Sequence, residues 1–582
     1  KIKTMKKNIF LVKIVYLFFT LFIINSCTKQ FEDLNIDPNA FNSSAPENLF
    51  AGSVKSTLDL VGGVMNDQMF MMYASYYGGK GGQFSNFFFT ENALDNWWKQ
   101  FYVDCIKNNQ EIIDTYSDNP DFKNRVLIAK IWKSYQYSVL VSTFGGVPFE
   151  DASKGLNATN YSTEEEIYTS ILDMLKEAGE QIDKNGDQLL PDPIFNGNTE
   201  LWIKFANSLR LKIALRISEG FPTLAQQHGV DVMIKESDFI SSNSENALIK
   251  WGSEQQNWSY NYSRYIFVEP LIDILPNINF HYILNLKTYG DPRLFAIVEP
   301  SNNPIDIIDE VFKSGSTTEK IRVRYKLAHF GRPLGGNGIV DGWNLNQNLN
   351  VLSGVATQRF SRPKKEVFMA QDMSFNLITN AEINFMKAEA KLKGWGGSKT
   401  IEQYYYDGID ASFQQYGVSG ASQYKQRDGI RWGSASVGDK DLYGIQTSGI
   451  SADPMDKIVR QRWLGSFNQG HDMWCLQKRT RLLPIIAHFN PDGSTGLDWS
   501  EIPERMVYPP LSESGFNNAG YIAASARLAN GNDLTSPLQM NKPYTPVNYP
   551  SLNVEFNQDF ATNFYGPSED DLIAAGIPYT KL

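Results

Sequence analysis

The sequence has 582 residues, a formal charge of −10, and 42% hydrophobic residues. This composition is sufficient for a large core, and because no block of basic residues stands out in an acidic chain, we set nucleic-acid binding aside. Three cysteines are too few for a disulfide scaffold.

The first segment has the pattern of a secretory signal peptide. Two lysines precede an apolar run, Ile9 to Ile24, that is interrupted only by Lys13. The run is too short for a membrane span, and it ends close to a small residue, Ser26, directly before Cys27. We therefore predict that residues 1–26 are removed. Because they hold five lysines and no acid, removal takes the formal charge from −10 to −15.

A cysteine directly after a small residue resembles the lipobox of bacterial lipoproteins. In that motif the cysteine receives a diacylglycerol and an N-acyl chain and becomes the first residue of the mature protein. Several acyl chains on Cys27 would anchor the protein stably, whereas one chain binds membranes only marginally. The polar segment 27–44 is then a lipidated tether. An ordinary signal peptide followed by a chance cysteine is the alternative.

Helical periodicity dominates the mature chain at about 45–237 and 380–528. Apolar spacing and capping residues predict helices over 46–77, 91–116, 121–143, 162–183, 202–217, 221–235, 380–392, 400–416, 455–468 and 472–481. The pair 380–392 and 400–416 has small alanines where two helices would touch, as in tetratricopeptide units. We expect a single α-helical domain over 45–582.

The segment at about 240–379 differs from the helical parts. It is rich in Asn, Ser, Gly, Pro and aromatic residues and shows little periodicity, which predicts long loops and short strands. So much loop in a compact protein is usually functional. We expect a ligand-binding face here.

Five stretches resemble the SusD/RagB lipoproteins, especially the second SusD-like subgroup. They are the Cys27–Asn39 opening; Gly197 with Trp202, Phe205–Arg210 and Arg216; Asp291–Arg293; Ala381-Glu382 with Ala388–Ala390 and Gly394-Trp395; and Ile502–Pro510. They lie in family order and cover nearly the whole mature chain. Glu504 stands where a basic residue is common, and Gly290 where Asn often precedes the Asp-Pro-Arg.

The resemblance implies a mainly α fold of about four tetratricopeptide-like hairpins with a large loop-rich, ligand-binding face. It also implies a non-catalytic lipoprotein of the outer membrane, facing the cell exterior. Such proteins capture an oligosaccharide or a peptide and act as a lid over a SusC-like TonB-dependent transporter in nutrient uptake. A non-transport structural or accessory subunit of an outer-membrane complex is the alternative, because such helical scaffolds bind proteins well.

Candidate ligand residues must be argued from chemistry, because the family has no sugar-binding motif of fixed spacing. A sugar site needs exposed aromatic faces beside Asn, Asp or Arg. Two groups fit: Tyr76, Tyr77, Phe84, Asn86 and Trp97 around a glycine-rich loop, and Trp258, Tyr260, Asn261, Tyr262 and Arg264. Each could instead pack beneath its loop. Trp98 shares an apolar stripe with Cys105 and is expected to be buried, which leaves Trp97 to face outward.

The sequence contains little that supports a catalytic function. Glu382 and Glu389 share a helix face, but at about 10 Å by the 1.5 Å rise they lie slightly beyond the range of an inverting glycosidase. We expect them to form salt bridges with Arg460, Arg462 or Arg479. The five histidines are scattered and match no metal-ligand spacing, and no Gly-x-Ser-x-Gly motif occurs. We therefore expect no enzyme, no metal and no cofactor beyond the covalent lipid on Cys27.

Overall fold

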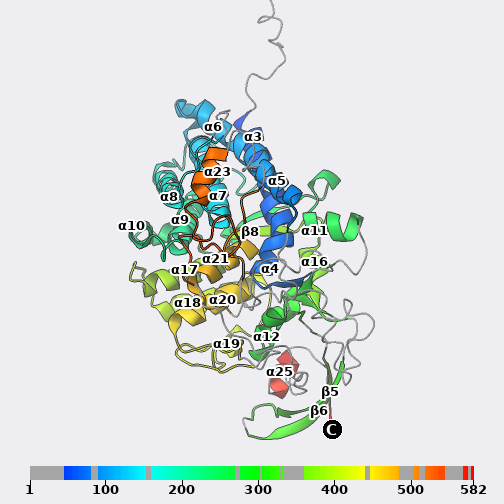
Figure 1. Ribbon diagram of the computed structural model, residues 1–582. Coiled ribbons are helices and arrows are strands. Elements are labelled where there is room, and N and C mark those ends of the chain that lie inside the picture. The colour runs from blue at the N-terminus through cyan, green and yellow to red at the C-terminus, as the bar shows by residue number, and fades with distance from the viewer. Residues whose placement is uncertain are drawn as a thin grey trace, which may run out of the picture. The chain divides into compact units, whose positions relative to one another are not determined.

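The computed structural model of the protein is shown in Figure 1. It describes residues 45–79, 89–152, 159–268, 275–301, 305–316, 318–327, 329, 331–332, 360–439, 446–483, 502–509, 518–543, 568–574 and 578–582. The predicted signal peptide, Cys27, the tether, Phe84 and Asn86 lie outside these residues. Leu49–Leu582 forms one compact unit.

The N-terminal helices pack in succession. They are α3 (Pro46–Thr57), η1 (Leu58–Phe70), α4 (Met71–Tyr73), α5 (Glu91–Gln100), η2 (Phe101–Ile106), α6 (Lys107–Tyr116), α7 (Lys123–Phe144), α8 (Glu164–Gln181), α9 (Thr199–Arg216) and α10 (Pro222–Met233). Each of α6 to α9 packs against the next helix. Local capping fixes their starts: Thr163 and Glu166 form a capping box on α8, and Asn198 caps α9.

The second helical group consists of α17 (Asn380–Leu392), α18 (Ile401–Gln415), α20 (Pro454–Gly465) and α21 (Gly470–Thr480). The α17–α18 hairpin that the alanines predicted is present, and α17 also packs on α20 and α9. Thr400 begins α18 with a capping box to Gln403. The mainly α, tetratricopeptide-like fold is therefore confirmed.

The loop-rich part carries short strands in four small sheets. Their antiparallel pairs are β1 (Tyr77–Gly79) with β3 (Asn277–Ile278), β2 (Ala247–Lys250) with β8 (Ser374–Ile378), β4 (Val298–Glu299) with β7 (Arg362–Pro363), and β5 (Ile305–Phe312) with β6 (Lys320–Leu327) and β9 (Tyr579–Lys581). Short helices lie among them: α11 (Tyr260–Tyr262), η7 (Ser263–Val268), α12 (Phe280–Thr288), α13 (Arg293–Ile297) and α16 (Lys365–Phe368). Three further short helices come later in the chain: α19 (Ala421–Tyr424), α23 (Asn518–Ser525) and α25 (Glu569–Ala574). The β5–β6 hairpin and α25 lie at one end of the unit (Figure 1).

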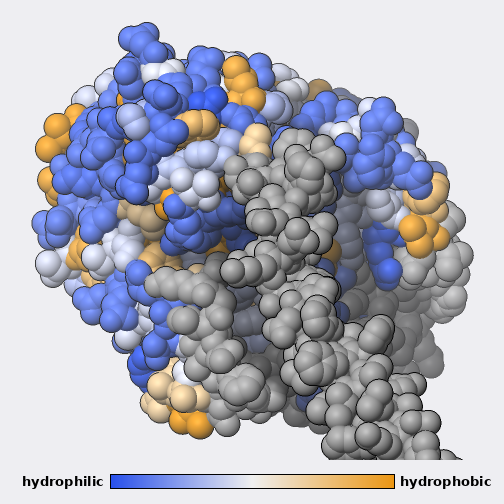
Figure 2. Space-filling view, turned by 90° about the horizontal axis from the view of Figure 1, so that it is seen from above, coloured by the Kyte–Doolittle hydropathy of each residue, from blue (hydrophilic) through white to orange (hydrophobic). Residues whose placement is uncertain are grey.

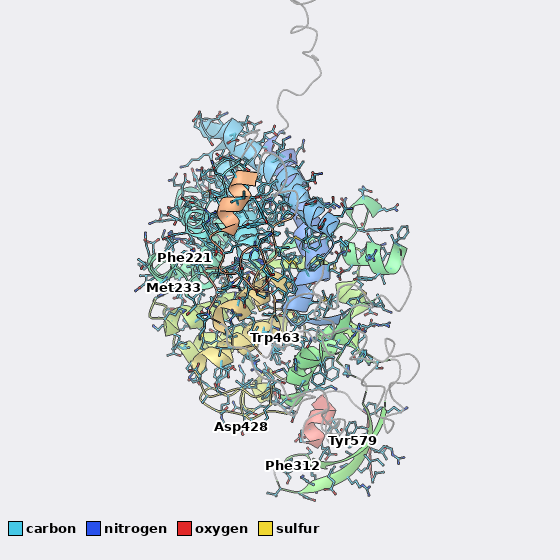
Figure 3. All side chains as sticks on the ribbon, viewed as in Figure 1. Phe221, Met233, Phe312, Asp428, Trp463 and Tyr579 are labelled. Carbon is cyan, nitrogen blue, oxygen red and sulfur yellow. The ribbon has the colours of Figure 1, made fainter. Side chains whose placement is uncertain are left out.

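Large aromatic side chains fill the core. Trp132, Trp202, Trp463 and Trp474 have no exposed surface, and Trp463 lies where α20 meets the loop-rich part (Figure 3). The face in Figure 2 is largely hydrophilic, with hydrophobic residues scattered across it. No helix in the described ranges combines the length and apolarity needed to cross a membrane.

Candidate functional site

The first predicted aromatic group belongs to the core. Tyr76 and Tyr77 are at most 1% exposed and Trp97 is 4% exposed. The Tyr76 hydroxyl donates to the carbonyl of Trp463 at 2.6 Å, and the two rings stack at 6.0 Å. Trp97 packs edge-on against Phe89 at 5.1 Å. These three residues support the fold and present no face to a ligand.

The prediction that Trp97 faces outward is wrong because the helix changes its pitch. Trp98, which the stripe assigned to the core, is only half-buried. The next segment, η2, has π-helical i→i+5 hydrogen bonding, so its turn holds more residues than an α-turn. The stripe traced back from Cys105 therefore shifts by one position and falls on Phe101, Trp97 and Leu94.

The second predicted group forms an aromatic patch on the surface. Its centre is Trp258, whose ring meets Tyr262 at 4.9 Å and Phe267 at 5.0 Å, both edge to face. Trp258 and Tyr262 are half-buried, Arg264 is exposed, and Phe267 and Val268 are 54% and 63% exposed. We call these five residues the Trp258 patch. Exposed apolar groups of this kind usually mark binding surfaces.

Four side chains of the segment hold it to the rest of the protein. The Ser259 hydroxyl donates to the carbonyl of Ala370 at 2.7 Å, and Asn261 donates to the carbonyl of Phe368 at 2.9 Å. The hydroxyl of Tyr265, which is 2% exposed, donates to the carboxylate of Asp67 at 2.8 Å. Tyr260 accepts from the Gln68 amide at 2.8 Å. Of the predicted residues, Tyr260 and Asn261 thus position the segment, and Trp258, Tyr262 and Arg264 belong to the patch.

Sequence reasoning missed two members of the patch. Phe267 and Val268 continue the run Tyr265-Ile266-Phe267-Val268, which has the composition of a core strand. The segment is instead the π-helix η7, so the run does not alternate between two faces. Aromatic spacing alone gave no sign of this.

The two candidate catalytic carboxylates are buried ion-pair partners. Glu382 accepts from Arg462 at 2.6 Å and lies 3.2 Å from Lys212, and Glu389 forms two bonds with Arg479 at 2.5 and 2.8 Å. Two of the three predicted arginine partners are therefore correct. Arg460 instead donates to the side chain of Asn285 and to the carbonyl of Gly449.

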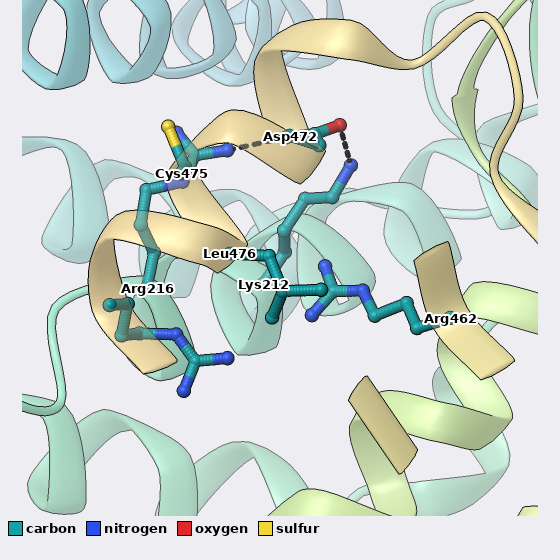
Figure 4. A pocket seen from close by; sticks show the side chains of 7 residues that line it. Lys212, Arg216, Arg462, Asp472, Cys475 and Leu476 are labelled. Atoms are coloured by element: carbon teal, nitrogen blue, oxygen red, sulfur yellow. Dashed lines mark hydrogen bonds and ion pairs between the residues drawn. The ribbon is translucent and has the colours of Figure 1, made fainter. Parts of the chain in front are cut away.

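The ion pairs border a cavity of about 10 Å³ between α9, α20 and α21 (Figure 4). Asp472 accepts from Lys212 at 2.5 Å and from Arg216 at 2.6 Å across it. Burial alone would raise the pKa of the neighbouring Cys475, but the charges of His471 and Arg216 hold it lower, at about 6. A space of this size suits one water molecule and excludes a substrate. This cluster therefore stabilises the packing of the helices.

A second buried pair lies in the Asp-Pro-Arg stretch. The Arg293 guanidinium donates to Asp291 through Nε at 3.0 Å and through Nη2 at 2.6 Å, and both side chains have no exposed surface. Among the described residues, no group of three or more His, Cys, Asp or Glu side chains converges as metal ligands would.

A family model described as SusD-like, starch-binding and associating with the outer membrane matches residues 38–509. No curated protein sequence matches the chain.

Solved structures share the fold at low sequence identity. A chitin-binding protein is 20% identical with a TM-score of 0.67, covering 86% of this chain and 100% of its own. A SusD homolog from Bacteroides uniformis is 19% identical with a TM-score of 0.66, at the same coverage of both chains. A chitin-binding SusD homolog from Flavobacterium johnsoniae is 19% identical with a TM-score of 0.64, covering 86% of this chain and 98% of its own. Because the family model spans most of the sequence, the chain belongs to the SusD-like family, whose members bind ligands rather than catalyse reactions.

Proposed function

We propose that the protein is a cell-surface lipoprotein that captures an oligosaccharide at the Trp258 patch and delivers it to a SusC-like TonB-dependent transporter. The patch is the observation that carries this proposal. Trp258, Tyr262 and Phe267 supply apolar ring faces, and Arg264, two positions after Tyr262 in the chain, is an exposed polar residue. Sugars combine apolar C–H faces with hydroxyl groups, so they match a surface that offers both.

Membership of a family associated with the outer membrane supports the proposed location. The chitin-binding neighbours support a glycan as the ligand rather than a peptide. The lipid on Cys27 supplies the membrane anchor in this proposal and is tested below.

Replacing Trp258 by alanine should weaken glycan binding about tenfold or more, because a lost ring contact of roughly 1.4 kcal/mol corresponds to that factor. The fold should persist, because Trp258 is only half-buried and, among the described residues, its indole N–H bonds only to the carbonyl of Ser253. Isothermal titration calorimetry with neutral and acidic oligosaccharides and with peptides measures the change. Trp432→Ala, which removes another half-buried tryptophan, is the control. Equal affinity of the two variants for every ligand refutes the patch.

Purification of the tagged protein from its native membranes tests the partner. A single barrel-type transporter recovered with the protein is the expected result. Recovery of a multi-subunit assembly without such a transporter would favour the structural role instead.

A further inference from the structure

The segment from Lys320 to Arg332 concentrates positive charge in an acidic protein. It contains five Lys or Arg residues and no Asp or Glu, whereas the whole chain carries −10. The basic residues alternate with apolar ones, which is why no basic block was apparent in the sequence. Strand β6 places four of them, Lys320, Arg322, Arg324 and Lys326, on one exposed face, while Val323 and Tyr325 are buried on the other.

This basic face spans about 20 Å, because alternate residues of a strand are about 7 Å apart. Arg322 and Lys326 lie opposite Glu310 and Asp306 of β5, but Arg324 lies opposite Ile308 and, on its other side, Thr580. Lys320 lies opposite Phe312, with its ammonium 5.2 Å from the ring centre. Phe312 of β5 and Tyr579 of β9 mark this three-stranded sheet in Figure 3. In the described part of the chain, no ion pair within 4.0 Å neutralises any of the four.

Arg332, the last residue of the segment, is buried, unlike the four exposed basic residues of β6. It is 1% exposed, yet its Nε and Nη1 atoms have no acceptor among the described residues. Its backbone is fixed, since its N–H donates to Ile278 at 2.8 Å and its carbonyl accepts from Phe280 at 2.9 Å. Asn277, next to Ile278, has a buried amide nitrogen that also lacks an acceptor within the described ranges. At the junction of β3 and α12, three buried nitrogen atoms therefore have no hydrogen-bond acceptor in the part of the chain that the structure describes.

Other buried arginines have acceptors for part or all of the guanidinium: Arg293 and Arg479 bind carboxylates, and Arg505 binds the carbonyl of Phe144 and the side chain of Asn532. Burial lowers the pKa of Arg332 to about 10, and no acid among the described residues offsets the effect. A buried guanidinium without a counter-charge is strongly unfavourable, and water would satisfy its hydrogen bonds but not its charge. An anion would supply both the hydrogen-bond acceptors and the counter-charge that the described residues around Arg332 do not provide.

We infer that Arg332, with Asn277 beside it, receives an acidic group of the ligand, a carboxylate or a sulfate of an acidic glycan, and that the basic face of β6 attracts the same polymer. A guanidinium binds either group through two parallel hydrogen bonds. This inference rests on the proposed function and narrows its ligand class. The exposed charges act at longer range and fix no geometry.

The Arg332→Met variant, made in the full-length protein, tests the role of the buried guanidinium. With oligogalacturonate and a sulfated glycosaminoglycan as probes, the variant should bind at least one of them about a hundredfold more weakly, and its melting temperature should rise because an unpaired buried charge is removed. The two probes separate carboxylate from sulfate recognition. A variant that melts lower, or that binds both acidic probes as the native protein does, overturns the inference.

Arg324→Gln tests the basic face without touching the core, and Arg431→Gln removes an exposed arginine elsewhere as its control. Only Arg324→Gln should weaken binding of the acidic probe, severalfold at low salt and less at high salt, where charges are screened. Tighter binding of chito- or malto-oligosaccharides than of acidic probes overturns the acidic class and leaves the proposed function standing. Binding of neither glycan class refutes both. Preferential binding of anionic vesicles or of nucleic acid also overturns the inference.

Discussion

Replacing Arg293 by methionine is expected to destabilise the protein by about 3–5 kcal/mol, the usual effect of leaving one member of a buried ion pair without its partner. The Arg293 guanidinium, besides its bonds to Asp291, donates to the hydroxyl of Ser412 and the amide oxygen of Gln461, both at 2.9 Å. It therefore joins α13 to α18 and α20. Methionine matches the length of the side chain but leaves the Asp291 carboxylate buried without a counter-charge. Urea denaturation followed by circular dichroism measures the loss.

The double variant Asp291→Leu, Arg293→Met is the matched control. Removing both charges together should restore much of the lost stability, because apolar replacements of a whole buried pair are often neutral. An Arg293→Met variant within 1 kcal/mol of the native protein would contradict the prediction. A double variant less stable than Arg293→Met would show that Asp291 has a further structural role.

Replacing Cys27 by alanine is expected to abolish membrane attachment almost completely. The acyl chains that we propose on this cysteine account for the whole anchor, since anchoring needs more than one chain and alanine can carry none. The variant should leave the membrane fraction or keep its unprocessed signal segment. Fractionation with metabolic labelling by a tagged fatty acid gives the measurement.

Cys105→Ala and Cys475→Ala are the controls, because both cysteines are free and buried and should retain label and attachment. A Cys27→Ala protein that is fully processed and still pellets with membranes would refute the lipid anchor.

The helical scaffold could be predicted because its signals are local. Apolar spacing and caps such as Thr163 and Thr400 act within a few residues, so they can be recognised without the fold. The partners of Glu382 and Glu389 were also predictable, because both acids lie on one helix face and need nearby cations when buried. The loop-rich part offered no such regularity.

The binding residues depend on distant contacts. Tyr76 is a core residue because of Trp463, which lies 387 positions away, and nothing near Tyr76 in the sequence indicates this. Trp97 became a core residue and Trp98 only half-buried because the π-helical segment η2 changed the phase of their helix. The basic residues of β6 form one charged face only because a strand places alternate residues on the same side.

The buried charges around Figure 4 also limit how the protein can change shape. Lys212 and Arg216 of α9, Glu382 of α17, Arg462 of α20 and Asp472 of α21 are linked without a gap. Sliding any one of these helices would leave a buried charged side chain without its ion-pair partner. Any change of shape that keeps these ion pairs must therefore move all four helices together as one body.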